Sequence, residues 1–124
     1  MLFLAPMTSR QGIENIFLEK GIRSSEFSGC VTAKNGDELL GLCLYELDSE
    51  KITVHYIEPL NDVPLADGIL RSTLHVAAER SVMNAFYSDT VPEDFLKMIG
   101  FIKDADEKSL DIDKLFKSCK SCGK

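Results

Sequence analysis

The residues best suited to acid–base chemistry lie near the middle of the 124-residue chain. His55 carries an imidazole, whose intrinsic pKa of about 6.5 suits proton transfer near neutral pH. Glu46 and Glu58 lie near it in the sequence and offer carboxylates, so we take His55, Glu58 and Glu46 as candidate general bases. A histidine within a strand also commonly packs against its neighbours or faces solvent. The other histidine, His75, lies in a segment with helical spacing and is expected at a helix surface.

Two thiols near the end of the chain have the spacing C-x-x-C, at Cys119 and Cys122. A zinc site would need further ligands, which no other segment offers at ligand spacing, so we expect no metal. A redox pair normally opens a helix that follows a strand, whereas these residues lie in a lysine-rich tail. The simplest interpretation of this pair is two exposed thiols on a terminal tail. Cys30 and Cys43 lie within apolar runs and are expected to be buried.

Apolar periodicity and turn residues divide the chain into strands and helices that position these groups. The Asn-Gly pair at 35–36 is typical of a hairpin turn. Cap-type residues at Asn61 and Asp62, followed by Pro64, predict the start of a long helix, and Gly100 predicts the end of another. Strands are expected at 2–7, 30–34, 39–47, 51–57, 84–88, 101–102 and 109–113, and helices at 8–21, 61–80 and 90–100.

That order of elements predicts an α/β fold with a mixed, largely antiparallel sheet flanked by helices. A hydrophobic fraction of 44% and a charged fraction of 27% are ordinary for a globular chain and argue against disorder. We expect one domain over residues 1–113, followed by a lysine-rich tail at 114–124. An exposed sheet edge at Ser109–Asp113 would allow a homodimer.

Four segments, in this order, resemble motifs of the GNAT acetyltransferase superfamily. Ile-Glu-Pro at 57–59 resembles the end of the family's fourth strand, and Leu-Ala-Asp-Gly-Ile-Leu at 65–70 falls where the family carries its acyl-CoA pyrophosphate loop. Asn-Ala-Phe-Tyr at 84–87 matches the fifth strand. Phe-Leu-Lys-Met-Ile-Gly-Phe at 95–101 resembles the helix that follows it. Only one helix is evident near the N-terminus, where the family usually has two.

The resemblance implies an N-acetyltransferase that moves acetyl from acetyl-CoA to a primary amine by direct attack. The backbone near Ile57, on a splayed strand, would polarise the thioester. Gly68, Ile69, Arg71 and Ser72 would hold the pyrophosphate at a helix start, and His55 or Glu58 would be the base.

Several residues depart from the family pattern. Leu65 stands where the family has Gln or Arg, Leu70 where it has a second glycine, and Leu96 where it has a tyrosine that protonates the thiolate. Asp67 adds a carboxylate to the same loop, which repels phosphate. Whether the chain is an enzyme therefore stays open. The alternative is an inactive GNAT-fold scaffold that binds a partner protein or a small anion, and it is favoured if Leu65 and Leu70 project into the cofactor cleft.

The net charge and the apolar runs indicate which classes of partner the chain can bind. The chain has 14 basic and 20 acidic residues, a net charge of −6, which argues against a nucleic-acid surface. No apolar run is long enough for a membrane helix and the start does not resemble a signal peptide, so we expect a cytoplasmic protein with no membrane partner.

Overall fold

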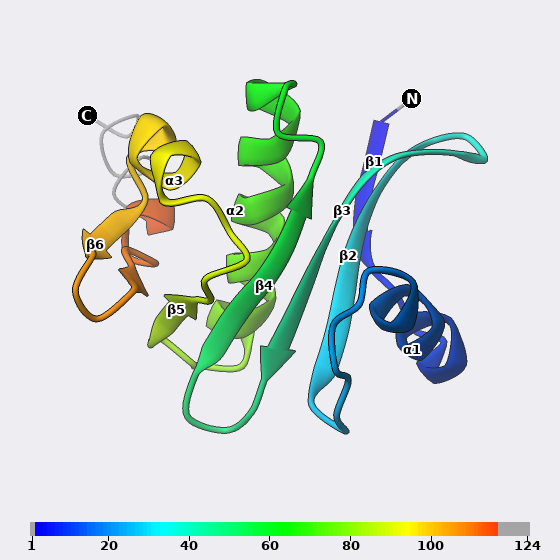
Figure 1. The fold of residues 1–124 in the computed structure, drawn as a ribbon, viewed down its shortest axis with the longest axis horizontal. Coiled ribbons are helices and arrows are strands. Elements are labelled where there is room, and N and C mark those ends of the chain that lie inside the picture. Colours follow the sequence, from blue (N-terminus) through cyan, green and yellow to red (C-terminus); the bar gives the residue numbers. More distant parts are fainter. Residues whose placement is uncertain (1, 117–124) are drawn as a thin grey trace.

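The computed structural model describes residues 2–116, and within them seven strands form one sheet in the order β1-β2-β3-β4-β5-β7-β6 (Figure 1). Neighbouring strands are antiparallel except for β4 and β5, which are parallel. The predicted mixed, largely antiparallel α/β sheet is therefore confirmed. The elements are β1 (Leu2–Pro6), α1 (Arg10–Glu19), β2 (Ser28–Asn35), β3 (Glu38–Leu47), β4 (Ile52–Glu58), α2 (Val63–Glu79), β5 (Ala85–Tyr87), α3 (Glu93–Ile99), β6 (Ile102–Asp104) and β7 (Ser109–Leu110).

The two long helices lie on opposite faces of the sheet (Figure 1). On one face, α1 buries Ile13 and Phe17 against β2 and β3. On the other, α2 buries one apolar stripe against the strands, and α3 closes the same core with Phe95 and Leu96. Helix α1 lies beside β2 and β3 and away from most of β4 (Figure 1), and Tyr56 of β4 packs against the same cluster as Ile13 and Phe17.

The helix boundaries follow local signals in the sequence. Ser9 caps α1, where its Oγ atom accepts a hydrogen bond from the Gly12 N–H at 3.0 Å. Asp62 caps α2 and Pro64 lies in its first turn, as predicted. Gly100 ends α3 with a φ of 76°, which is the left-handed conformation that a glycine adopts at no steric cost.

A close approach at Gly41 fixes the end of β4 relative to α2. A Cβ atom added at Gly41 would lie 2.5 Å from the Glu58 carbonyl oxygen and 2.8 Å from the Ile69 Cδ1 atom. Only hydrogen fits there, so β3 lies directly against the end of β4 and the second turn of α2.

The C-terminal part of the fold corrects one expectation. The predicted exposed edge at Ser109–Asp113 is wrong, because β7 (Ser109–Leu110) lies inside the sheet and pairs with β5 on one side and β6 on the other. The edges of the described sheet are β1 and β6. Leu110 of β7 is buried in the core.

Residues just beyond the expected domain boundary at 113 contact the folded domain. Lys114 donates through Nζ to the Ile99 carbonyl at 2.6 Å and to the Gly100 carbonyl at 3.2 Å, and Leu115 packs against the core. Cys119 and Cys122 lie outside the described residues. None of the described helices has the length and apolar character needed to cross a bilayer.

The buried cysteines behave as predicted. Cys30 and Cys43 are fully buried and form no disulfide. Burial raises the pKa of each thiol to about 12, because a thiolate would lose its hydration. Both residues therefore pack in the hydrophobic core, and burial makes their thiols poor nucleophiles.

Candidate functional site

The parallel pairing of β4 and β5 ends halfway along β4, because β5 itself ends at Tyr87. Their pairing covers only Ile52–Val54 of β4, although that strand continues to Glu58. Past β5, the chain follows β4 for a short distance, where the Ser88 N–H donates to the Val54 carbonyl at 3.0 Å and the Thr90 hydroxyl donates to the His55 carbonyl. Beyond these contacts, the last residues of β4 have no paired strand on the β5 side. The splay that the resemblance implies stays a prediction.

A β-bulge lies just past the end of this pairing. Tyr56 of β4 is opposite Leu44 of β3, and Val54 is opposite Tyr45, so His55 has no opposing residue. Bulges redirect side chains, and they are common beside active sites. The His55 side chain is about one-fifth exposed and points to the face of the sheet that carries Glu46.

His55 and Glu46 form a hydrogen-bonded pair. The His55 Nε2 atom lies 3.0 Å from Glu46 Oε1, and the Ser25 hydroxyl donates to Glu46 Oε2 at 2.5 Å. The hydrogen bond from Ser25, and then that from His55, hold the Glu46 pKa below its usual value. The ionised carboxylate favours a proton on Nε2 of the neutral imidazole, so Nδ1 is the nitrogen that accepts a further proton.

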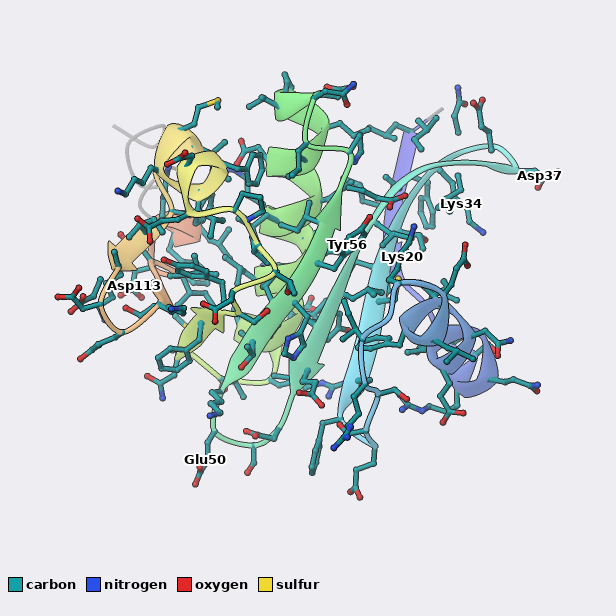
Figure 2. All side chains as sticks on the ribbon, in the orientation of Figure 1. Lys20, Lys34, Asp37, Glu50, Tyr56 and Asp113 are labelled. Atoms are coloured by element: carbon teal, nitrogen blue, oxygen red, sulfur yellow. The ribbon has the colours of Figure 1, made fainter. Side chains whose placement is uncertain are left out.

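Glu58, the other predicted base, is held by two donors. Its Oε1 atom accepts from the Tyr56 hydroxyl at 2.6 Å and pairs with Lys20 Nζ at 2.9 Å. These hydrogen bonds, from Tyr56 first and Lys20 second, lower the Glu58 pKa. Lys20 also lies 5.3 Å from the centre of the Tyr56 ring, and Figure 2 shows both side chains between α1 and β4. Glu58 is therefore a weaker base than a free carboxylate.

The start of α2 has little to offer an anion. Asp62 Oδ1 accepts the Leu65 N–H at 3.3 Å, and the Asp62 carbonyl accepts the Ala66 N–H at 2.9 Å. Pro64 has no N–H to donate. The open pocket in front of this helix start is lined by Leu40, Pro59, Asn61, Asp62, Val63, Pro64 and Leu65, with one acidic and no basic side chain among them. These residues do not fit a pyrophosphate group.

The predicted pyrophosphate residues lie further along α2. Gly68 is in the second turn, where an added Cβ would lie 3.8 Å from Leu4 of β1. Ile69 is fully buried in the core. Arg71 pairs with Asp67 at 3.2 Å and its guanidinium lies 5.1 Å from the Phe101 ring centre. The N–H groups of residues 68–72 are interior to the helix, where each is bonded to the carbonyl four residues earlier.

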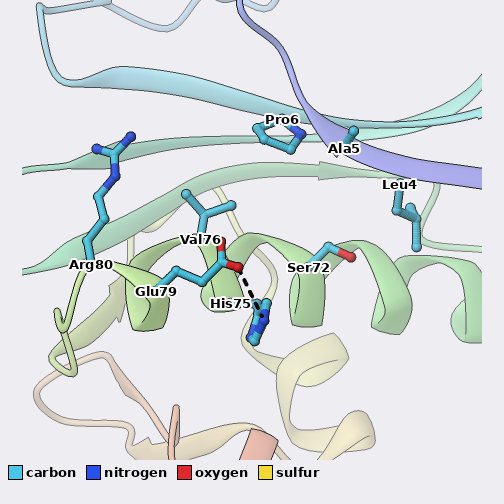
Figure 3. A pocket seen from close by; sticks show the side chains of 8 residues that line it. All are labelled: Leu4, Ala5, Pro6, Ser72, His75, Val76, Glu79 and Arg80. Atoms are coloured by element: carbon cyan, nitrogen blue, oxygen red, sulfur yellow. Dashed lines mark ion pairs between the residues drawn. The ribbon is translucent and has the colours of Figure 1, made fainter.

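Ser72 belongs to a different cavity, between α2 and β1 (Figure 3). This pocket of about 390 Å³ also contains His75, which pairs with Glu79 at 3.7 Å. It lies on the α2 side of the sheet, whereas Tyr56 beside His55 packs toward α1. The structure thus separates Ser72 and His75 from the His55 site.

Two of the apolar departures from the family pattern, Leu70 and Leu96, are fully buried core residues. Leu65 is only partly buried: it packs against the same core and also lines the open pocket at the helix start. The Ile57 side chain is also buried, so only its backbone can face a ligand beside β4. Within residues 2–116, no three metal-binding side chains gather at one point.

Sequence reasoning missed Ser25 and Lys20. Ser25 lies in the loop after α1 and Lys20 at the end of that helix, and both reach β3 or β4 only through the tertiary fold. No local signal marks either residue.

No family model and no curated protein match the sequence. Solved structures do match. A protein from Desulfovibrio desulfuricans, described as an acetyltransferase of the GNAT family, has a TM-score of 0.58 at 12% identity, over 84% of this chain and 87% of that one. A ribosomal-protein-alanine N-acetyltransferase from Brucella melitensis has a TM-score of 0.56 at 16% identity, over 79% and 88%.

A third neighbour was solved with a ligand. It is YhhK from E. coli, described as an N-acetyltransferase and bound to coenzyme A, with a TM-score of 0.53 at 15% identity, over 84% of this chain and 93% of that one. At such identities the likeness concerns the fold, and the chain has a GNAT-like fold.

Proposed function

We propose that this GNAT-fold chain is an N-acyltransferase that moves acetyl from acetyl-CoA to a primary amine. The observation that carries the proposal is the position of His55, at the bulge just past the residues of β4 that pair with β5, with Nε2 held 3.0 Å from the Glu46 carboxylate. The coenzyme A bound to YhhK supports a thioester donor of this kind.

His55 acts as the general base. A primary amine is protonated at neutral pH and must lose a proton to become a nucleophile. With Nε2–H held by Glu46, Nδ1 of His55 accepts that proton, directly or through one water molecule. Glu58 is less suited to this role, because Tyr56 and Lys20 stabilise its ionised form.

The backbone of β4 near Ile57 stabilises the developing oxyanion. The amine nitrogen forms a bond to the thioester carbon, the carbon–sulfur bond breaks, and the electron pair leaves on sulfur. The thiolate takes its proton from water, since Leu96 is buried and has no proton to donate. Transfer is direct, with no acyl group on the protein.

The test compares the only two histidines in the chain. Purified protein is incubated with acetyl-CoA and a panel of primary amines, including peptide N-termini, and the acetylated product is measured by mass spectrometry. His55→Gln should lower kcat by about 10²–10⁴-fold, the usual contribution of a general base. The matched control, His75→Gln, changes an exposed residue in the other pocket and should retain full activity.

Two outcomes would contradict the proposal. Absence of acetylated product from every amine would exclude transfer and favour a scaffold that only binds. Equal activity of His55→Gln and His75→Gln would exclude His55 as the base.

A further inference from the structure

The first turn of α2 presents a negative charge at the point where a phosphate-bearing donor needs a positive one. A helix start attracts anions through its free N–H groups and its dipole. Here the carboxylate of Asp62 accepts from Leu65, and its own carbonyl accepts from Ala66. Pro64 removes another donor. Asp62 thus occupies the position that a phosphate oxygen would take.

No nearby cation offsets this charge within the pocket at the helix start, since its lining contains one acidic and no basic side chain. The basic residue closest along the helix is Arg71, and it is already engaged. Its Nε atom lies 3.2 Å from Asp67 and its guanidinium stacks over the Phe101 ring. Lys20, at the end of α1, is paired with Glu58 at 2.9 Å.

The last residues of β4 offer strand backbone to a ligand. Residues 55–58 continue past the end of β5 at Tyr87, where the Thr90 hydroxyl donates to the His55 carbonyl. An uncharged amide chain such as pantetheine can exchange hydrogen bonds with strand backbone without any phosphate contact. In the orientation that the GNAT resemblance implies, the thioester end of coenzyme A would therefore meet strand backbone, and its diphosphate end would meet the Asp62 carboxylate.

We propose that Asp62 is a specificity residue that makes the chain select its acyl donor by the pantetheine arm and not by the nucleotide diphosphate. The donor class is then an acyl-pantetheine thioester, of which acetyl-CoA is one member. This inference rests on the proposed acyl transfer and names the part of the donor that the site recognises.

Asp62→Asn tests the charge without removing the cap. Asparagine caps helices as well as aspartate does, so the helix start and the melting temperature should be preserved. The matched control is Glu50→Gln, which removes one carboxylate from the exposed β3–β4 turn (Figure 2). That turn lies at the opposite end of β4 from the start of α2 (Figure 1).

Binding is measured by calorimetry at low salt with pantetheine, 4′-phosphopantetheine and coenzyme A, which form a series of increasing phosphate charge. In the wild type the three dissociation constants should agree within about threefold. Asp62→Asn should tighten coenzyme A about fivefold, the effect of removing one like charge at close range, and leave pantetheine unchanged. Glu50→Gln should change neither ligand.

Three results would overturn the inference. If the wild type binds coenzyme A more than tenfold tighter than pantetheine, the diphosphate is recognised, and the proposed acyl transfer stands without this specificity. If Asp62→Asn leaves the ratio of the two constants unchanged, Asp62 is not the specificity residue. If neither ligand binds, the proposed function fails together with the inference.

Discussion

The imidazole of His55 and the carboxylate of Glu46 meet 3.0 Å apart across two neighbouring strands, at the one place where the pairing of β3 and β4 shifts by a residue. In a regular antiparallel ladder, side chains alternate between faces, and two residues of adjacent strands share a face only at fixed positions. His55 follows Val54 in the strand, so ordinary alternation puts its ring on the face that carries Glu46 and Thr53. The bulge then brings Tyr56 onto that same face.

Glu46 should position His55 and not bind substrate. Glu46→Ala leaves Nε2 without its acceptor, so kcat should fall about tenfold or more while KM stays near the wild-type value. Glu46→Gln keeps an oxygen acceptor and should recover part of that loss. The measurement is steady-state kinetics with the amine that gives product. A rise in KM with unchanged kcat would instead place Glu46 in contact with the amine.

A substitution at Gly68 tests whether the second turn of α2 has a structural role or binds the donor. Its added Cβ meets Leu4 only at an ordinary contact distance of 3.8 Å. Gly68→Ala should therefore stabilise the protein by about 0.5–1 kcal/mol, because alanine loses less backbone entropy in a helix. Pantetheine and coenzyme A binding should not change. Loss of coenzyme A binding in a folded variant would show that the donor approaches the backbone at this glycine.

Gly41→Ala gives the contrasting case. Its Cβ would lie 2.5 Å from the Glu58 carbonyl oxygen, which is backbone and cannot rotate away. We expect a loss of about 1–3 kcal/mol in the free energy of unfolding. Urea denaturation of both glycine variants measures the two effects on one scale, and a neutral Gly41→Ala would mean that β3 and β4 can separate at this point.

Leu96→Tyr tests whether a tyrosine at the family's position would restore a proton donor. Leu96 is fully buried between α3 and the sheet, so the larger ring has no space and its hydroxyl has no water. The variant should lose about 1–3 kcal/mol of stability by overpacking and gain no activity. Thermal unfolding and the acetylation assay check the two statements. A stable variant with a raised kcat would mean that residue 96 faces the reacting sulfur.

Glu58 predicts a pH dependence of stability. Its pKa is lowered in the folded state by the Tyr56 hydroxyl and then by Lys20. A lowered carboxyl pKa contributes stability above the unfolded value of about 4.3, and that contribution disappears as pH falls through the folded pKa. Glu58→Gln should therefore flatten the fall in stability between about pH 5 and pH 3, with Glu50→Gln as control. Because Glu58 is about one-third exposed, the effect is expected to be small.

The elements of the fold could be read from the sequence because their signals are local. The Asn-Gly turn, the Asp62 cap with Pro64, and Gly100 each act through the backbone within a few residues. The β4 bulge and the contacts of Ser25 and Lys20 are not local. They depend on how distant segments pack, so no pattern in the sequence predicts them.

The placement of the pyrophosphate loop illustrates the same limit. The spacing of a family motif put the helix start at 65–70, whereas the capping residues put it at 61–64. The structure follows the capping residues, because the cap determines which N–H groups remain outside the helical ladder. Where a motif and a cap disagree about a helix start, the cap is the better guide.

Lys114 shows where the folded unit can be trimmed. Its ammonium satisfies the carbonyls of Ile99 and Gly100 and lies 4.6 Å from the centre of the Phe101 ring. A chain cut after residue 113 would leave the end of α3 without this partner and would uncover one face of a buried aromatic ring. The shortest version that retains the whole core therefore ends at or after Leu115, which also packs against it.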